Sequence, residues 1–273
     1  CRLENIPNIV DVMVQLEIVR GLGADVRFVN PTTVEIDSRH INADRPPYDL
    51  MRKLRASYYF IGALLGRFNR AEVAMPGGCN FGGVRPIDLH IKGFEALGAV
   101  TSIKEGGHVC VQADDGLVGK NIFLDVVSVG ATMNIMLAAV MAKGQTIIEN
   151  AAKEPHIVDL ANFLNSMGAQ VMGAGTDVIK IHGVESLHGG TYSIIPDQIE
   201  AGTYMAAVTA TGGSLLIRSI IPRHLECISV KLIEMGAEVE YFDDSVRVSR
   251  TGPLTRSNIK TMPYPGFSTA MQP

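Results

Sequence analysis

The chain has 273 residues, of which 47% are hydrophobic and 19% are charged, and its formal net charge is -4. This length suits one large domain or two ordinary ones, and the composition is that of a globular protein. Basic and acidic residues are interspersed, so we expect no nucleic-acid surface, and the most apolar segment, 133–141, is too short to span a membrane. The cysteines form no Cys-x-x-Cys pair, which predicts neither a zinc site nor a disulfide framework. We therefore expect a cytoplasmic protein with reduced thiols, no membrane or nucleic-acid partner and no cofactor.

Four segments of the sequence share one pattern. Each has an amphipathic helix that ends in a Gly-Ala pair, followed by a strand, a turn and a second strand. The glycine suits the position after a helix where a left-handed residue is needed, and the alanine begins the strand. Each of the last three segments is preceded by a further helix and a further strand. The repeated unit, of roughly 70 residues, is therefore helix, strand, helix, strand, strand, and the four pairs are Gly23-Ala24, Gly98-Ala99, Gly168-Ala169 and Gly236-Ala237.

The loop at 75–90 combines glycines with groups that can carry chemistry. It places Cys79 between two pairs of glycines and continues with Arg85, Asp88 and His90. Four glycines in one loop are costly to order, so the loop is either a mobile lid or a close approach to a ligand. A nearby arginine could lower the pKa of the thiol or tune it as a proton donor. The alternative is a surface hairpin with an incidental cysteine, and His90 is alternatively a histidine at the start of a helix.

Alternating strands and helices predict an α/β fold. The expected helices at 129–142 and 200–210 are apolar on nearly every face and rich in small residues, so we expect both to lie inside a ring of sheets and helices. Pro196 interrupts the pattern, which predicts a first domain at 1–195 and the start of a second at 196–273. Because the chain opens on Cys1 and stops just after a new element begins, we expect a fragment.

The repeat and five motifs resemble the enolpyruvyl transferase family along the whole chain. The motifs lie at 76–79, 85–90, 128–132, 149–155 and 196–203. The resemblance implies an inside-out α/β barrel with buried helices in each of two domains, the second incomplete here. It further implies transfer of the enolpyruvyl group of phosphoenolpyruvate to the 3′-hydroxyl of UDP-N-acetylglucosamine, with release of phosphate, as the committed step of peptidoglycan biosynthesis.

The same resemblance implies roles for particular residues. Cys79 corresponds to the proton donor, which also forms a covalent adduct with phosphoenolpyruvate or with fosfomycin. The position of the base that deprotonates the sugar hydroxyl falls on Ala270. The residues implied to bind the substrates are Arg55, Arg85, Pro86, Ile87, Asp88, Leu89, Val126, Val127, Ser128 and Val129. For Ser128 the alternative is a simple helix cap, and for Arg55 it is a solvated helix face.

Three departures from the family pattern bear on activity. Ala270 stands where the family has an aspartate, and a methyl group cannot accept a proton. The segment 82–84 has one residue more than is usual between the cysteine and the arginine, and Gln198 replaces a frequent arginine. The family's Lys-Asn pair and its carboxy-terminal arginines lie outside this chain, so we expect the chain as given to be catalytically poor.

Two alternative functions remain open at this point. One is the shikimate-pathway enolpyruvyl transferase, against which the Cys79 loop and the strip at 85–90 argue. The other is a non-catalytic paralogue that binds the UDP-sugar, an interpretation that Ala270 favours.

Overall fold

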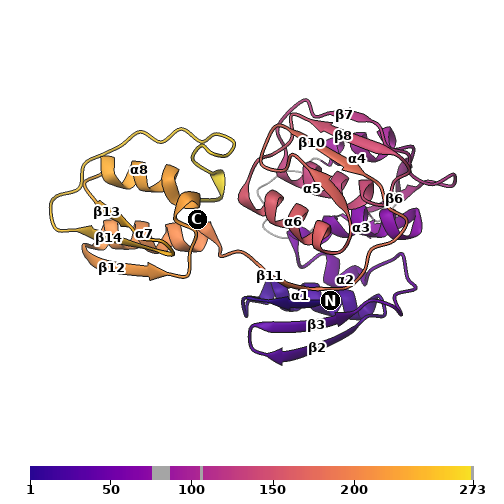
Figure 1. The fold of residues 1–273 in the computed structure, drawn as a ribbon, viewed down its shortest axis with the longest axis horizontal. Helices are drawn as coiled ribbons and strands as arrows, with labels where there is room; N and C mark the ends of the chain where they lie inside the picture. The colour runs from indigo at the N-terminus through magenta and orange to yellow at the C-terminus, as the bar shows by residue number, and fades with distance from the viewer. Residues whose placement is uncertain (76–86, 105–106, 272–273) are drawn as a thin grey trace. The chain divides into compact units, whose positions relative to one another are not determined.

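The structure is a computed structural model, and it describes residues 1–75, 87–104 and 107–271 (Figure 1). The chain divides into two compact units. Unit 1 comprises Cys1–Lys153 and Ile157–Ile194, and unit 2 comprises Glu154–His156 and Ile195–Pro273. The assignment of 1–195 and 196–273 to a catalytic-loop domain and an incomplete second domain stays a prediction.

Within its described residues, unit 1 contains three sheets. Some of their strands alternate between buried and more exposed positions, as at 145–149, where Thr146 and Ile148 are buried and Gln145 and Glu149 are exposed. The strand orders are β11 (Thr191–Ser193), β1 (Arg2–Glu4), β3 (Thr33–Asp37), β2 (Asp25–Asn30); β4 (Arg70–Ala74), β6 (His108–Gln112), β5 (Val100–Lys104); and β7 (Asn121–Phe123), β8 (Gln145–Glu149), β10 (Val178–His182), β9 (Gln170–Met172).

One helix of unit 1, α5 (Val129–Ala139), is buried, and α3 (Tyr59–Phe68) and α4 (Asp88–Ala96) pack against it (Figure 1). Its side chains Ile135, Met136 and Ala138 are fully buried, which confirms the expectation of an internal helix here. The other helices are α1 (Val10–Gly21), α2 (Tyr48–Met51), the 3₁₀ turn η1 (Arg55–Tyr58), α3 (Tyr59–Phe68), α4 (Asp88–Ala96) and α6 (Pro155–Ser166). Arg55 lies in the 3₁₀ turn η1, which leads directly into α3.

Unit 2 contains, in its described residues, one sheet with two helices and two 3₁₀ turns. The elements are α7 (Gln198–Thr211), β12 (Gly213–Arg218), η2 (Pro222–Leu225), α8 (Glu226–Glu234), β13 (Glu238–Tyr241), β14 (Ser245–Arg250) and η3 (Thr269–Met271). The expectation that the helix at 200–210 would be buried on all sides was wrong for unit 2, because this single sheet covers one face of α7. Ala201 and Met205 are buried there, while Tyr204 is 53% exposed.

The predicted repeat is confirmed in the order of the strands. In each repeat the last strand lies between the first two, as in β4-β6-β5, β8-β10-β9 and β12-β14-β13, and β1-β3-β2 follows the same order. The glycines of the four Gly-Ala pairs have φ angles of 106°, 96°, 98° and 102°. In each pair the alanine N–H donates to the carbonyl five residues earlier, for example Ala99 to Phe94 at 3.0 Å. All four helices therefore end in the same Schellman motif.

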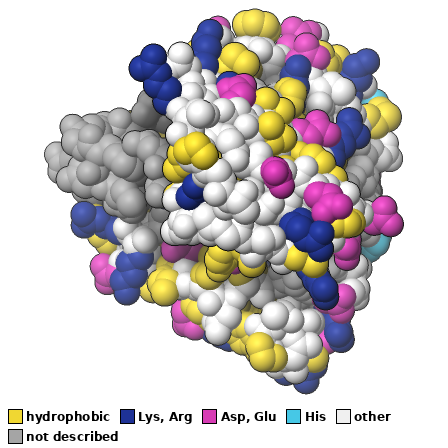
Figure 2. All heavy atoms as spheres, turned by 90° about the vertical axis from the view of Figure 1, so that its left-hand side faces the viewer, with side chains coloured by type: hydrophobic (Ala, Val, Ile, Leu, Met, Phe, Trp, Pro, Cys, Tyr) yellow, Lys and Arg dark blue, Asp and Glu magenta, His cyan; other side chains and the backbone are white. Residues whose placement is uncertain are grey.

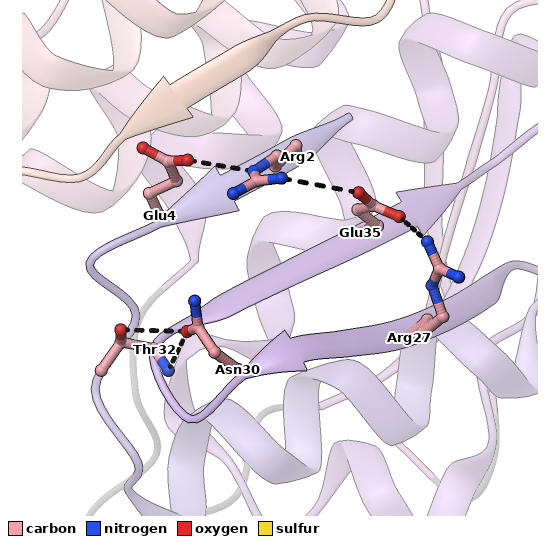
Figure 3. A network of polar contacts seen from close by, with 6 residues as sticks. All are labelled: Arg2, Glu4, Arg27, Asn30, Thr32 and Glu35. Atoms are coloured by element: carbon pink, nitrogen blue, oxygen red, sulfur yellow. Dashed lines mark hydrogen bonds and ion pairs between the residues drawn. The ribbon is translucent and has the colours of Figure 1, made fainter.

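Charged side chains bridge the strands on the surface of the sheets. On the sheet of β1, β3 and β2, Glu35 lies opposite both Arg2 and Arg27 and pairs with each of them (Figure 3). The hydrogen bond from Arg27 holds the pKa of Glu35 below its usual value. On the face drawn in Figure 2, basic and acidic side chains are interspersed rather than grouped by sign, in agreement with the charge pattern of the sequence.

Candidate functional site

The structure describes some of the predicted site residues and not others. Cys79, Arg85 and Pro86 lie outside the described residues. Arg55, the strip 87–89 and the strip 126–129 belong to unit 1, and Ala270 belongs to unit 2.

The strip 126–129, which the family resemblance implies to bind a substrate, leads into the first turn of α5. The Ser128 side chain caps the helix by accepting a hydrogen bond from the Ala131 N–H at 3.2 Å, and its carbonyl accepts from the Thr132 hydroxyl at 2.8 Å. The cap leaves the N–H groups of Val129 and Gly130 at the free end of the helix, where neither has an intrahelical acceptor. The capping role of Ser128 is thus confirmed, and the two free amides are groups of the kind that bind anions.

The first turn of α4 lies beside the first turn of α5. Asp88 is the first residue of α4, and the preceding Ile87 is buried in the core. One helical turn further on, Lys92 Nζ contacts Asp125 Oδ2 at 2.6 Å, which ties α4 to the segment leading into α5. Val126, 65% exposed, leaves this segment open to a ligand.

Arg55 opens the 3₁₀ turn η1, and a buried serine fixes that turn. The Ser57 hydroxyl contacts the carbonyls of Met51 at 2.8 Å and Leu54 at 2.7 Å. At the end of the turn, the Tyr58 hydroxyl donates to the Tyr59 hydroxyl at 3.3 Å, and burial raises the pKa of Tyr59. Arg55 itself is exposed. Exposure is expected both for a residue that binds a ligand and for a solvated surface residue, so it does not decide between these two roles.

One buried amide joins these three segments. Asn134, in the middle of α5 and fully buried, accepts a hydrogen bond from the Gly62 N–H at 2.8 Å and donates to the Tyr58 carbonyl at 2.9 Å. Its Nδ2 also lies 2.9 Å from His90 Nδ1 on α4. The motifs of the sequence did not single out Asn134. The signal available was an amide in the middle of an otherwise apolar helix, where a buried polar side chain must find partners.

His90 is the ionisable group at this junction. It is 6% exposed, and its ring meets the Tyr58 ring edge-on at a centroid distance of 5.0 Å. Burial lowers the pKa of His90 to about 4, against the opposing effect of Asp88, so the imidazole is neutral at pH 7. The histidine is therefore part of the site region, and the structure brings it together with Arg55, the α4 turn and the α5 turn.

Ala270, at the predicted position of the base, belongs to unit 2 and is the middle residue of the 3₁₀ turn η3. Its N–H donates to the Ser268 hydroxyl at 3.1 Å, and its methyl group is exposed. The side chain offers neither a proton acceptor nor a charge.

Two negative findings hold for the part of the chain that the structure describes. There, no helix is both long and apolar enough to cross a membrane. The same residues contain no group of three or more His, Cys, Asp or Glu side chains placed to hold a metal ion.

Comparison with known proteins identifies the class. Residues 1–273 match the family described as EPSP synthase (3-phosphoshikimate 1-carboxyvinyltransferase). The chain therefore belongs to this family of enolpyruvyl transferases, and the resemblance drawn from the motifs is confirmed. The chain also superposes on the enolpyruvyl transferase NikO from Streptomyces tendae with a TM-score of 0.86 and 26% identity, covering 99% of this chain and 64% of that one. This likeness confirms the expected enolpyruvyl transferase fold.

Particular relatives are more similar in sequence. UDP-N-acetylglucosamine 1-carboxyvinyltransferase 3 of Caldanaerobacter subterraneus subsp. tengcongensis is 58% identical over 270 residues, which is 99% of this chain and 64% of that protein. UDP-N-acetylglucosamine 1-carboxyvinyltransferase of Clostridium botulinum is 57% identical over 272 residues, which is 100% of this chain and 64% of that protein. The chain thus spans just under two thirds of the length of these relatives. An EPSP synthase from Acinetobacter baumannii shares the fold at 17% identity and a TM-score of 0.67.

Proposed function

We propose that the protein containing this chain transfers the enolpyruvyl group of phosphoenolpyruvate to the 3′-hydroxyl of UDP-N-acetylglucosamine and releases phosphate. The observation that carries the proposal is the 58% identity, over nearly the whole chain, to a relative named for this activity. The junction of η1, α4 and α5 agrees with it, because free helix amides and a nearby arginine suit a diphosphate. The reaction would serve peptidoglycan biosynthesis in the cytoplasm.

The reaction needs an acid, a base and a site for negative charge. A bond forms between the sugar oxygen and C2 of phosphoenolpyruvate while C3 gains a proton and the hydroxyl loses one; C3 then loses a proton as the bond to phosphate breaks. We assign proton donation to Cys79. Arg55 and Arg85 would hold charged groups of the substrates, and the amides of Val129 and Gly130 would bind the diphosphate. Ile87, Asp88 and Leu89, with Pro86, would receive the uracil.

The test is release of phosphate by the complete protein from phosphoenolpyruvate and UDP-N-acetylglucosamine, with shikimate 3-phosphate as the competing acceptor. The protein is assayed as found and as Ala270→Asp. We expect turnover with the UDP-sugar alone, and faster turnover for Ala270→Asp. Turnover with shikimate 3-phosphate alone would refute the assignment, and equal rates for both forms would show that another group serves as the base.

Ala270 supports a second candidate function, a binder of UDP-N-acetylglucosamine without catalysis. The exposed methyl group in η3 cannot take a proton from the sugar hydroxyl. This candidate predicts calorimetric binding of UDP-N-acetylglucosamine without phosphate release in the protein as found. A protein that showed no affinity for the sugar nucleotide would exclude both candidates.

A further inference from the structure

The orientation of the Asn134 carboxamide is fixed by its backbone partners. The Gly62 N–H can only donate, so the atom facing it at 2.8 Å must be the amide oxygen. The Tyr58 carbonyl can only accept, so the atom facing it at 2.9 Å must be the amide nitrogen. A flipped amide would place oxygen against oxygen and nitrogen against nitrogen.

This orientation determines which nitrogen of His90 carries the proton. Nδ2 of Asn134 is a donor, so Nδ1 of His90, 2.9 Å away, must accept. Because burial keeps the ring neutral at pH 7, the one remaining proton lies on Nε2. The His90 residue is only 6% exposed, and within the described part of the chain Nε2–H donates to no acceptor.

Nε2 lies at the first turn of α5. A Cβ atom added to Gly130 would lie 3.1 Å from His90 Nε2 and 2.9 Å from the Tyr58 hydroxyl, so both polar groups closely approach the second residue of the helix. The N–H groups of Val129 and Gly130 at the same turn have no intrahelical acceptor, and no other residue in the described part of the chain accepts from them. Two kinds of donor, the imidazole N–H and the backbone amides, therefore meet around one short stretch of backbone, and the glycine makes room for them.

We propose that Asn134 is a positioning residue that holds His90 in its Nε2–H tautomer, so that the imidazole donates a hydrogen bond to a phosphate oxygen bound at the first turn of α5. This inference rests on the proposed function for the identity of the ligand, the diphosphate of a nucleoside-diphosphate sugar. It adds a neutral donor to the charged and backbone groups of that site.

The tautomer decides whether the contact between His90 Nε2 and a phosphate oxygen is attractive or repulsive. With the proton on Nε2, the ring offers a donor to an anionic oxygen. With the proton on Nδ1, the Nε2 lone pair would face that oxygen, and two acceptors would oppose each other. Asn134 makes the second arrangement costly because its own N–H would then face the N–H of Nδ1. The amide thus excludes the tautomer that would repel the ligand.

The tautomer can be tested without any ligand. In the complete protein with ¹⁵N-labelled histidine, the His90 ring signals, assigned by their loss in His90→Gln, should report Nε2–H at pH 7. Asn134→Asp replaces the donor with an acceptor and should move the proton to Nδ1 or protonate the ring. A signal for Nδ1–H in the unaltered protein would overturn the proposal, as would an unchanged tautomer in Asn134→Asp.

The donor is tested with two amide substitutions at His90. Gln places its N–H near the position of Nε2, whereas Asn places its N–H near that of Nδ1. For UDP-N-acetylglucosamine measured by calorimetry, we expect His90→Asn to weaken binding about tenfold, as for loss of one hydrogen bond to a charged group. His90→Gln should bind within a few-fold of the unaltered protein. Uridine, which lacks the diphosphate, should bind all three equally.

The outcomes separate this inference from the proposed function. If the unaltered protein binds UDP-N-acetylglucosamine and the two variants bind it equally, the donor role of His90 is wrong while the proposed function stands. If the unaltered protein does not bind the sugar nucleotide, the proposed function fails, and the ligand named here fails with it. If the variants also differ in their affinity for uridine, His90 acts on the fold rather than on the diphosphate, which overturns the inference.

Discussion

The close approach of α3 and α5 makes Gly62 a sensitive position. An added Cβ would lie 2.3 Å from the Asn134 carbonyl oxygen and 2.5 Å from its Oδ1, well inside contact distance. Both atoms are held, one by the backbone of α5 and the other by the hydrogen bond to the Gly62 N–H itself. Gly62→Ala can therefore be accommodated only if the two helices move apart.

The cost can be worked from these contacts. Overpacking a buried contact costs about 1 to 3 kcal/mol, and leaving the buried Asn134 oxygen without its donor adds about 1 to 3 kcal/mol. The higher helix propensity of alanine returns about 1 kcal/mol. We expect Gly62→Ala to lower the free energy of unfolding by about 3 kcal/mol.

The assay is urea unfolding followed by circular dichroism, with Gly98→Ala as the matched control. At Gly98 the φ angle is 96° and an added Cβ would meet nothing within 4 Å. That substitution carries only the backbone cost of a left-handed alanine, about 1 kcal/mol. If Gly62→Ala proved no more destabilising than Gly98→Ala, the close contact between α3 and α5 would be refuted.

Three further predictions concern side chains of unit 1. Burial lowers the pKa of His90 from 6.5 to about 4, so below pH 6.5 the unfolded chain binds more protons than the folded chain does. The free energy of unfolding should therefore fall by about 2 kcal/mol from pH 7 to pH 5. The fall should be absent in His90→Gln when unfolding is measured at both pH values. Ser128→Ala should cost about 1 kcal/mol in urea unfolding by removing the cap of α5, and Ser128→Gly only a few tenths; equal losses would contradict the capping role. The Lys104 ammonium donates a hydrogen bond to Glu72 at 2.8 Å and lowers the pKa of that carboxyl. Lys104→Met should therefore raise the Glu72 pKa in a carboxylate NMR titration. The free energy of unfolding should change by less than about 1 kcal/mol, because the lysine is 54% exposed.

Local rules of the chain made the repeat predictable from sequence. A glycine that ends a helix and an alanine that starts a strand mark a Schellman motif wherever they occur, and φ angles such as 96° at Gly98 and 98° at Gly168 agree with that interpretation. The Ser128 cap follows from the same kind of short-range signal.

The junction at the site could not be predicted in the same way. Asn134 and His90 are 44 residues apart in the sequence, and only the packing of α4 on α5 brings them into contact. The sequence placed His90 either in a site or at the start of a helix; the structure confirms that it lies in the first turn of α4, and its place in a ligand site stays a prediction. The burial of α7 was overestimated, since an apolar pattern shows which faces can be buried but not how many layers cover them. The roles assigned to Cys79, Arg85 and Ala270 stay predictions.

The four identical helix ends have a consequence for how such a chain can be lengthened. Each helix is stopped by hydrogen bonds from its own Gly-Ala pair to the carbonyls of its last turn, so the change of direction into the next strand is encoded locally. A duplicated repeat would therefore keep the direction of its own hairpin relative to its helix. Duplication of one segment could extend the protein without redesign of any junction, and differences in length between copies would be absorbed by the turns between strands.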